Sequence, residues 1–492
     1  MSLAPDSLQH RSFAQNVLVL MSGTTVAQAI PLIVSPILTR LYTPTEFGVY
    51  AEYIAIVSIL AIFATGRYEL AVMLPDEDSE ALNVVASAIL VLSVTSLLTM
   101  LAFAAFNESW TAMLGVPEIS PWLYFVPLTL FPVGVYQTLT YWLNRQQQYR
   151  RLAVNDVAQK SVLEGGKWLL GRGAPGGALG NGLIAATVGG QMVAAGVLAC
   201  QVWRDGGASV AAVRPEKVWS NMRAYRKFPL FNVPYSLLGI FSAQFVIFAL
   251  TAFQHVHVAG FLSLTRRLVV GPINFLSASL GRVFFKETAV SIGTPRFEQL
   301  TVGLMVAIAE LFTPLFAFFA FWAPSVFGLI FGADWVEAGR YASVLVPMAF
   351  CSLFTTWPER VFEVSQKQQV SLTIQVVFDT ALIVLVWAGL RSGAEPLVVV
   401  AAYSVVSSAY HVAYLLGIFK IAGFAWTGLS RIGKRVLVHG AAVAALLSVL
   451  SLAVPEPLYQ FLIGGALVGA YSLRVVSRLV GASRRDGIAL PV

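Results

Sequence analysis

Long apolar runs separated by short polar connections fill most of this sequence. A helix needs roughly 20 apolar residues to cross the hydrocarbon core of a bilayer, which is about 30 Å thick. The runs do not alternate polar and apolar residues as the strands of a membrane barrel do. They cover residues 14–38, 46–66, 81–106, 121–143, 152–171, 181–202, 228–252, 257–284, 298–322, 340–357, 369–390, 395–418, 435–454 and 458–479. The pattern therefore predicts an all-α polytopic membrane protein with about 14 transmembrane helices.

The composition agrees with this pattern. Hydrophobic residues make up 57% of the 492 residues and charged residues 12%, with a mean hydropathy of +0.74. Soluble proteins carry about 25% charged residues. The longest connection, 203–227, is too short for a separate soluble domain. Cys200 and Cys351 are far apart and fall in predicted spans, so we expect two small core residues and neither a disulfide framework nor a metal site.

The cationic residues predict the orientation. Lys and Arg concentrate in the cytoplasmic connections of membrane proteins. The even-numbered connections and the two termini hold 24 of the 32 Lys and Arg, whereas the odd-numbered connections hold Arg40, Arg172, Arg340 and Arg391. This bias predicts that both termini are inside, and it accounts for the net charge of +7. The basic character thus indicates topology and contact with anionic membrane lipid, and we expect no nucleic-acid partner.

A faint internal repeat is present. Aligning "TPTEFGVYAEY" with "HVHVAGFLSLTRR" pairs Gly48 with Gly260, an offset of 212 residues. Each glycine then opens the second helix of a six-helix unit, and spans 13 and 14 are extra. The predicted parts are an N-terminal lobe (1–202), a cytoplasmic linker (203–227), a C-terminal lobe (228–420) and the extra spans with a tail (421–492). Paired repeats are common in transporters, whose substrate site lies between them near the midplane.

The fifth predicted span carries a row of charges. Asp156, Lys160, Glu164 and Lys167 fall within an arc of roughly 80° on one helical face. Neighbouring signs alternate, so that the row can pair internally. Because buried charge is costly, we expect this face to line a wet cavity or pack on another helix. A surface helix outside the bilayer and a purely structural ion-pair ladder remain alternatives.

Arg266 and Arg267 lie near the middle of the eighth span, some ten residues from its outer end. An arginine keeps its charge, and its fork of donors suits phosphate oxygens. We expect at least one of them to meet an anionic substrate. The alternative is an ion pair with an acid on another helix, such as Glu310 or Asp379.

Arg67 and Glu69 are expected at the cytoplasmic end of the second helix, and the repeat offset brings Arg282 within a turn of their equivalents. Cations there would suit a vestibule for a phosphate headgroup, or serve as ordinary positive-inside anchors. Glu310 and Asp379 are single polar residues deep in spans, as is His411. Each is either a site for a coupling ion or a hydrogen-bonded packing residue.

One motif must be set aside. Residues 428–435, "GLSRIGKR", nearly fit a phosphate-binding loop, but Arg435 replaces the Ser or Thr that binds magnesium and no strand precedes it. No metal cluster and no Ser/His/Asp arrangement stands out either. We therefore expect no cofactor, no metal and no enzymatic activity.

Several stretches resemble the bacterial oligosaccharide flippases, which handle O-antigen, capsule and exopolysaccharide repeat units. This family belongs to the superfamily of the multidrug and oligosaccharidyl-lipid/polysaccharide exporters, with the lipid II flippases. The resemblance is carried by "SGTTVAQAIPLIVSPILTRLYTPTEFGVYA", "RYELAVMLPDEDSEA", "YRKFPLFNVPYSLLGIFSAQFVIFAL" and "VAGFLSLTRRLVVGPINFLSASLGRVFFKE". The patterns "RYEL…LP" and "FPLFNVP" are the more specific parts. Fourteen spans depart from the frequent twelve.

The resemblance implies two six-helix lobes in a V shape around a cationic cavity. It implies alternating access that flips a polyprenyl-pyrophosphate-linked oligosaccharide across the bacterial inner (plasma) membrane for surface polysaccharide biosynthesis. It also implies that cavity cations hold the pyrophosphate and that the polymerase and chain-length machinery are protein partners. An ion gradient of H+ or Na+, the membrane potential or consumption of the product would drive the cycle. The matching cations here are Arg266, Arg267, Arg67 and Arg40, with Lys160 and Arg282 as further candidates; Asp156, Glu164, Lys167, Glu310 and Asp379 are candidates for cavity lining or ion coupling.

Two other functions compete with this one. An ion-coupled multidrug exporter of the same fold would favour carboxylates in its cavity, against which the deep arginine pair argues. A membrane enzyme such as a repeat-unit polymerase or a glycan ligase usually needs a large outer loop, and every odd-numbered connection here has about 20 residues or fewer.

Overall fold

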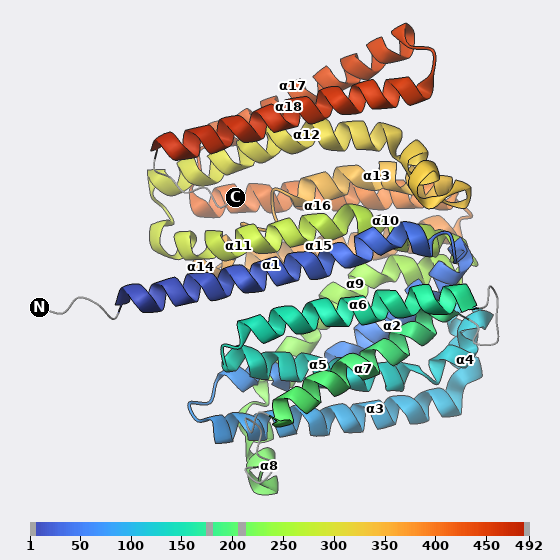
Figure 1. Cartoon of the computed structure of the whole chain (residues 1–492), viewed down its shortest axis with the longest axis vertical. Coiled ribbons are helices and arrows are strands. Elements are labelled where there is room, and N and C mark those ends of the chain that lie inside the picture. The colour runs from blue at the N-terminus through green and yellow to red at the C-terminus, as the bar shows by residue number, and fades with distance from the viewer. Residues whose placement is uncertain (1–5, 174–180, 205–212, 487–492) are drawn as a thin grey trace, which may run out of the picture. The chain divides into compact units, whose positions relative to one another are not determined.

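A computed structural model describes residues 6–173, 181–204 and 213–486, and these residues are helical with no strand among them (Figure 1). They divide into two compact units, one up to Leu264 and one from Thr265 onward. Each predicted span overlaps a helix or a run of consecutive helical segments, so the all-α membrane fold is confirmed. The predicted orientation of the termini and the exact number of crossings stay predictions.

The first unit holds the N-terminal helices. Its elements are α1 (Asp6–Leu38), α2 (Pro44–Ala64), η1 (Tyr68–Met73), α3 (Asp78–Leu114), η2 (Pro117–Ile119), α4 (Ser120–Leu123), α5 (Val126–Arg145), α6 (Tyr149–Gly173), α7 (Gly182–Arg204), α8 (Pro215–Ala224), η4 (Phe228–Asn232), α9 (Val233–Ala252) and nearly all of α10 (Val256–Thr265). The repeat would assign α9 and α10 to the second lobe. Here α9 packs against α2, and this contact places it with the first unit.

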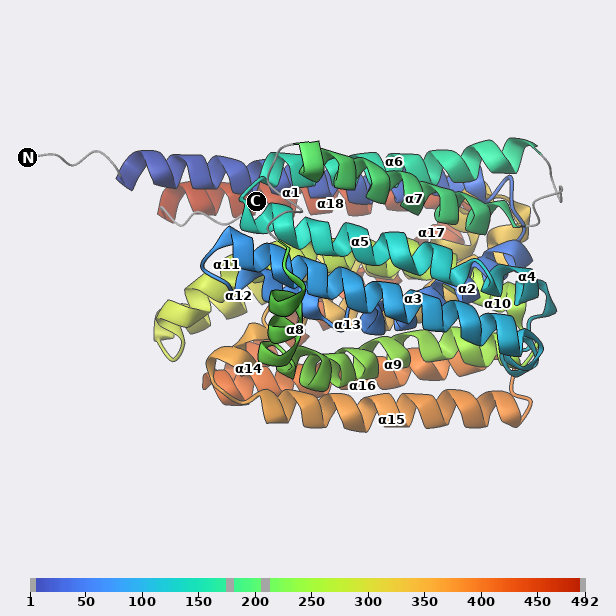
Figure 2. The same cartoon turned by 90° about the horizontal axis from the view of Figure 1, so that it is seen from below.

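The second unit begins inside the predicted eighth span. Its elements are η5 (Arg266–Val270), α11 (Gly271–Ser291), α12 (Pro295–Phe331), η6 (Ala333–Trp335), α13 (Val336–Ser352), α14 (Arg360–Val364), α15 (Gln368–Arg391), α16 (Pro396–Ala422), α17 (Trp426–Ala453) and α18 (Pro457–Asp486). The extra pair, α17 and α18, lies side by side along α12, and α15 pairs with α16 (Figures 1 and 2).

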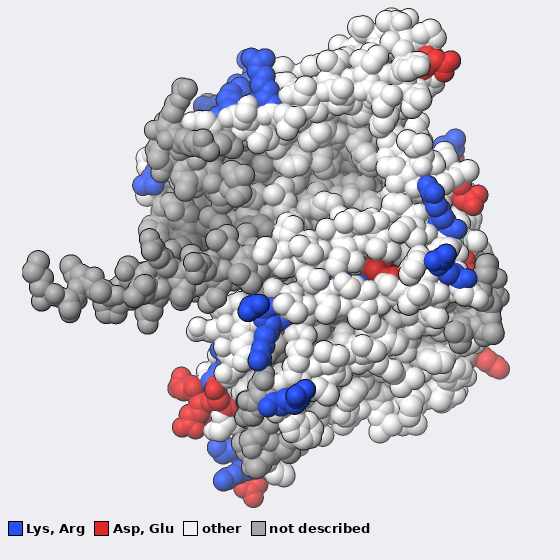
Figure 3. All heavy atoms as spheres, viewed as in Figure 1, with Lys and Arg blue, Asp and Glu red and all other residues white. Residues whose placement is uncertain are grey.

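Helix length and hydropathy agree with a membrane location. In the part of the chain that the structure describes, nine helices are long and apolar enough to span a bilayer, and Pro117–Leu123 passes the same test together with α5, to which it is bent by 56°. Large apolar side chains such as Leu437, Leu452 and Leu473 are exposed on α17 and α18, as lipid-facing residues are. In Figure 3 most charged side chains lie toward the helix ends and leave uncharged surface between them. The chain is a multi-pass membrane protein.

The two cysteines differ in their surroundings. Cys351 on α13 is half-buried, but Cys200 on α7 is exposed. The expectation that both are core residues was therefore wrong for Cys200. An apolar helix has a lipid-facing side as well as a packed side, and a small residue is tolerated on either.

A glycine contact joins α2 and α10 inside the first unit. α2 starts with a capping box in which Thr43 and Glu46 bond each other's backbone N–H, and Pro44 follows the cap. A Cβ atom on Gly48 would lie 1.9 Å from the Val256 carbonyl oxygen, and a Cβ atom on Gly260 would lie 2.0 Å from the Pro44 carbonyl oxygen. The offset of 212 maps each of these contacts onto the other. The glycines that the repeat pairs thus lie on a local two-fold crossing that only residues without a side chain permit.

Candidate functional site

The turn between α2 and α3 holds Arg67 and Glu69. Gly66 and Arg67 are both left-handed, with φ of 58° and 62°, and the second is costly for a residue with a side chain. The Glu69 carboxylate is 1% exposed and accepts hydrogen bonds from the Thr65 hydroxyl and, at 3.2 Å, from Gln137 Nε2. Arg67 contacts it only at 3.5 Å, and Arg67 Nε is buried with no acceptor among the described residues. The Glu69 carboxylate is thus well hydrogen-bonded, whereas the Arg67 guanidinium makes only a long contact with it.

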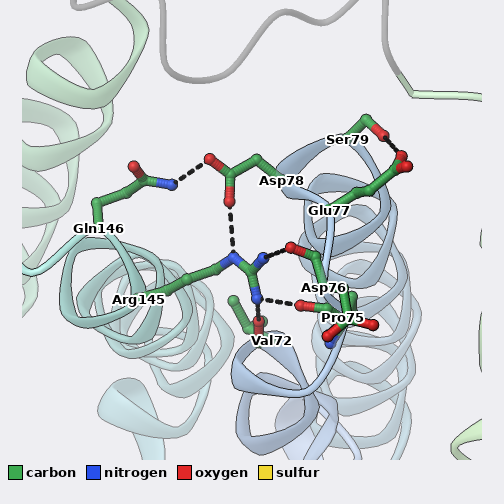
Figure 4. Close-up of polar contacts among 8 residues, drawn as sticks. All are labelled: Val72, Pro75, Asp76, Glu77, Asp78, Ser79, Arg145 and Gln146. Carbon is green, nitrogen blue, oxygen red and sulfur yellow. Dashed lines mark hydrogen bonds and ion pairs between the residues drawn. The ribbon is translucent and has the colours of Figure 1, made fainter.

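Two anchors fix this turn. The Tyr68 hydroxyl donates to the Met222 carbonyl on α8 at 2.9 Å, and burial raises the pKa of Tyr68. Arg145, at the end of α5, holds the following loop (Figure 4). Its guanidinium donates to the Asp78 carboxylate and to the backbone carbonyls of Val72, Pro75 and Asp76, at 2.6–3.3 Å. The "LPDED" part of the motif therefore has a structural role that keeps Arg67 in place.

The charged row on α6 splits into two parts. Glu164 and Lys167 are both buried and form an ion pair of 2.9 Å, and Lys167 Nζ also lies 5.0 Å from the centre of the Tyr50 ring. Asp156 is half-buried and accepts a hydrogen bond of 3.3 Å from Tyr136. Lys160, between them, is half-buried. The end of the row near Lys167 is thus a packed ion pair, and the end near Asp156 stays partly open.

Arg266 and Arg267 form the first turn of η5, a π-helical segment that links α10 to α11. π-helical turns of this kind are frequent at functional sites. Both side chains are half-buried. Arg266 Nη2 donates to the Tyr403 hydroxyl at 3.0 Å, and its guanidinium lies 5.9 Å from the centre of that ring. Tyr403 is a neutral partner, so this contact orients the guanidinium without cancelling its charge.

The candidate acids of the second unit have different surroundings. The Glu310 carboxylate on α12 pairs with Arg435 of α17 at 3.2 Å and with Arg478 of α18, so it holds the extra helix pair to α12. Asp379 is half-buried on α15. On α16, His411 Nδ1 lies 2.8 Å from the Thr355 hydroxyl.

Two of the predicted cations lie outside these clusters. Arg40 is exposed just beyond the end of α1, in the connection to α2. Arg282 lies on α11, and its side chain falls outside the described residues.

An acidic residue that the sequence analysis passed over lies in α2. Glu52 is fully buried, and its carboxylate contacts the Thr251 hydroxyl of α9 at 2.8 Å. The signal was available, because a single carboxyl group in the apolar run "FGVYAEYIAIV" is as costly as the charges that drew attention elsewhere.

An apolar groove lies on the first unit between α3, α5 and α7. It encloses about 450 Å³ and is lined by residues that include Leu97, Met100, Phe131 and Met192. Its walls suit a hydrocarbon chain and offer no charge to a headgroup.

Residues 37–340, more than half of the chain, match the family described as "Polysaccharide biosynthesis protein". The chain belongs to this family. The match includes the motifs that end at residues 81 and 287, so the family predicted from those motifs is confirmed. A search among curated proteins finds no sequence match.

Solved structures show the fold that this polysaccharide biosynthesis protein shares. It superposes on the lipid II flippase MurJ in an inward closed conformation with a TM-score of 0.73 at 12% identity, covering 96% of this chain and 100% of MurJ. An inward-facing multidrug resistance MATE transporter of the MOP superfamily gives 0.59 at 13% identity, covering 83% and 95%. A eukaryotic MATE transporter gives 0.51 at 15% identity, covering 86% and 100%. The chain thus has the fold of MOP-superfamily transporters.

Proposed function

We propose that this protein flips a polyprenyl-diphosphate-linked oligosaccharide across the bacterial inner membrane by alternating access, and that it does no covalent chemistry. Membership in the polysaccharide biosynthesis family and the fold of a lipid II flippase support this proposal. MurJ handles one lipid-linked saccharide, and the family name supplies the polysaccharide context. The repeat unit of a surface polysaccharide is the substrate that joins the two.

The physical task explains the charged groups. Sugar hydroxyls and a diphosphate would lose their hydrogen bonds in about 30 Å of hydrocarbon, at a cost of several kcal/mol for each group. A polar passage that opens to one side at a time replaces water along the way. The lipid tail stays in apolar surroundings, for which the groove beside Phe131 and Met192 is suited.

The observation that carries the proposal is the arginine pair on the π-helical turn of the eighth span. Arg266 and Arg267 are half-buried, and the neutral Tyr403 hydroxyl orients the Arg266 guanidinium. A guanidinium binds phosphate oxygens through parallel N–H donors. We propose that these two residues hold the diphosphate in mid-membrane. Arg67, with its buried and unsatisfied Nε, is the candidate for first contact, and Arg40, Lys160 and Arg282 are secondary candidates.

The multidrug exporter is the second candidate function, favoured by the MATE-like fold. It predicts that acids such as Asp156 or Asp379 bind a cationic drug. Arg266 and Arg267 would then be dispensable for recognition.

Replacing Arg266 and Arg267 separately by alanine tests the proposal in a strain that depends on this gene for its surface polysaccharide. We expect surface glycan to fall at least about tenfold in at least one variant at unchanged protein level, because a charge-assisted hydrogen bond is worth about 1.5–3 kcal/mol. Arg340→Ala is the matched control, since Arg340 is exposed and forms a surface ion pair with Glu337 on its own helix. Full glycan display in both variants, or drug resistance that follows expression of the protein, would refute the proposal.

A further inference from the structure

Glu52 is a buried acid without a counter-charge. It lies one helical turn from Gly48 on α2 and has no solvent exposure. Its Oε2 contacts Thr251 Oγ1 at 2.8 Å, whereas its Oε1 has no hydrogen-bond partner among the described residues. No described Lys, Arg or His forms an ion pair with it. The neighbours of Glu52 thus provide little electrostatic or hydrogen-bond stabilisation for an ionised carboxylate.

The contacts of Thr251 show where a proton belongs. The Thr251 hydroxyl oxygen lies 3.1 Å from the Ile247 carbonyl oxygen and 3.0 Å from the Phe248 carbonyl oxygen, besides its contact with Glu52. A hydroxyl group has one proton to donate. If Thr251 gives that proton to the carbonyls of its own helix, the proton in the contact with Glu52 must come from the carboxyl group. Only protonated Glu52 satisfies all of these contacts together.

The place of Glu52 links its charge to the crossing of α2 and α10. Gly48 and Gly260 bring the two backbones into direct contact, and Glu52 lies one turn further along α2. The apolar cluster on this part of α2 includes Val49, Ile56 and, from α9 and α10, Phe248 and Val256. A carboxylate here can regain water only if α2 separates from α9 and α10.

The second half of the repeat lacks this acid. The offset of 212 places Leu264 at the position of Glu52, and Leu264 is 1% exposed. Of these two paired positions, only Glu52 is titratable.

We propose that Glu52 is a proton-binding site that keeps the crossing of α2 and α10 closed while it is protonated and lets the crossing open once it is ionised. This inference rests on the proposed function, to which it assigns the coupling ion. With the predicted topology, the crossing lies at the outer face. A proton from the outer water binds the Glu52 carboxylate and closes that face, and the face opens again once the proton is lost.

Other titratable groups near α2 have their own partners or stay exposed. The Tyr53 hydroxyl donates to the Phe125 carbonyl at 3.0 Å and lies 2.6 Å from the Thr129 hydroxyl on α5, and Tyr50 contacts Lys167. His255 lies in the turn between α9 and α10. Its pKa is lowered mainly by burial and secondly by the charge of His257, so that His255 is neutral at neutral pH. The elements packed against α2 are α3, α5, α7, α9, α10 and η2. Their remaining titratable groups near the outer ends are the exposed Glu108, Glu118 and His257, and those toward or near the inner ends are Asp78, Glu80, Tyr136, Tyr141, Arg145, Cys200, Arg204 and Tyr235.

A cysteine introduced at a buried position of α10 can report whether the crossing is open. Ala259, beside Gly260, is 0% exposed, so that Ala259→Cys should react with a water-soluble maleimide only in the open form. The native Cys200 and Cys351 are first replaced by serine. The purified protein is placed in nanodiscs without any oligosaccharide lipid and labelled at about pH 5 and about pH 9.

Thiol chemistry itself depends on pH, because the thiolate reacts. Each rate is therefore divided by the rate for the same reporter in a Glu52→Gln background at the same pH. Glutamine copies the shape of the protonated acid and cannot ionise. His255→Gln is the second control, since it removes the histidine of the turn between α9 and α10 and leaves Glu52 in place. Thermal melting shows that each variant is folded, and Ala55→Cys, also 0% exposed, replaces the reporter if Ala259→Cys does not fold.

We expect the normalised rate to rise at least about tenfold from the acidic to the alkaline condition, with the same rise in His255→Gln. A ratio that does not change with pH, or a response lost in His255→Gln, overturns the inference. The result is separable from the proposed function, because labelling needs no substrate. If labelling responds to pH but the protein does not flip oligosaccharide, the proposed function is refuted and the role of Glu52 stands. If the protein flips oligosaccharide but labelling does not respond to pH, the role of Glu52 is refuted and the proposed function stands.

Discussion

A methyl group added at the glycine crossing should force α2 and α10 apart. In Gly48→Ala the new Cβ atom would lie 1.9 Å from the Val256 carbonyl oxygen, and in Gly260→Ala it would lie 2.0 Å from the Pro44 carbonyl oxygen, whereas real Cβ contacts stay beyond 3.0 Å. The helices must therefore separate by about 1 Å, because the obstacle is backbone and cannot rotate away.

The size of the effect follows from two opposing terms. Overpacking a well-packed site costs about 3 kcal/mol at the upper end of its usual range, which applies here because backbone meets backbone. Alanine is better than glycine in a helix by about 1 kcal/mol. The closed crossing should lose about 2 kcal/mol, which is about a 30-fold change in the equilibrium between closed and open.

Maleimide labelling of Ala259→Cys at fixed pH measures this change. Gly165→Ala on α6 is the matched control, because a Cβ atom there meets nothing within 4 Å, and its labelling should not rise. The two crossing substitutions should together raise labelling by less than the product of their separate effects, since the first methyl group already separates the helices. Equal labelling in Gly48→Ala and Gly165→Ala, or fully multiplicative effects, would refute the reasoning.

Three further substitutions test the supporting contacts. Arg145→Ala should lower the free energy of unfolding by about 2–4 kcal/mol in denaturant titration, because this one side chain donates to four acceptors. Arg145→Lys should restore less than half of that loss, because an ammonium group lacks the guanidinium fork. A lysine variant as stable as the native protein would contradict this. Lys167→Met should lower the free energy of unfolding by about 3–5 kcal/mol, because it leaves Glu164 buried without its partner. Adding Glu164→Gln should restore most of that stability, and a double variant no more stable than Lys167→Met would contradict the ion-pair account. Arg67→Gly should raise the free energy of unfolding by up to about 1 kcal/mol, because it removes a side chain from a left-handed backbone position. The same variant should display less surface glycan. Glycan display equal to that of the native protein would show that Arg67 is not needed for transport.

The hydrophobic pattern was sufficient for the helices, because membrane spans must be long and apolar whatever they pack against. The eighth span shows the limit of that reasoning. Its apolar run continues smoothly past Arg266, but the structure widens there into a π-helical turn and the two units divide beside it. The hydropathy of a run carries no information on such a turn, nor on the contact that the Arg266 side chain makes with Tyr403, 137 residues away.

The charged row on α6 was predictable in part. Its spacing indicates one face and alternating signs, and the Glu164–Lys167 pair has that i,i+3 spacing. Which members of the row are buried depends on how α1 and α7 cover α6, and helical periodicity carries no information about the neighbours. The repeat likewise aligned Gly48 with Gly260 but did not show that they meet.

Binding of a short-chain polyprenyl diphosphate to the purified protein tests the central claim most directly. The account predicts that affinity falls at least about tenfold in Arg266→Ala or Arg267→Ala, that Arg340→Ala binds as the native protein does, and that the corresponding monophosphate binds more weakly. Unchanged affinity for the diphosphate in both arginine variants, in protein that melts normally, would contradict the claim that these arginines recognise the substrate.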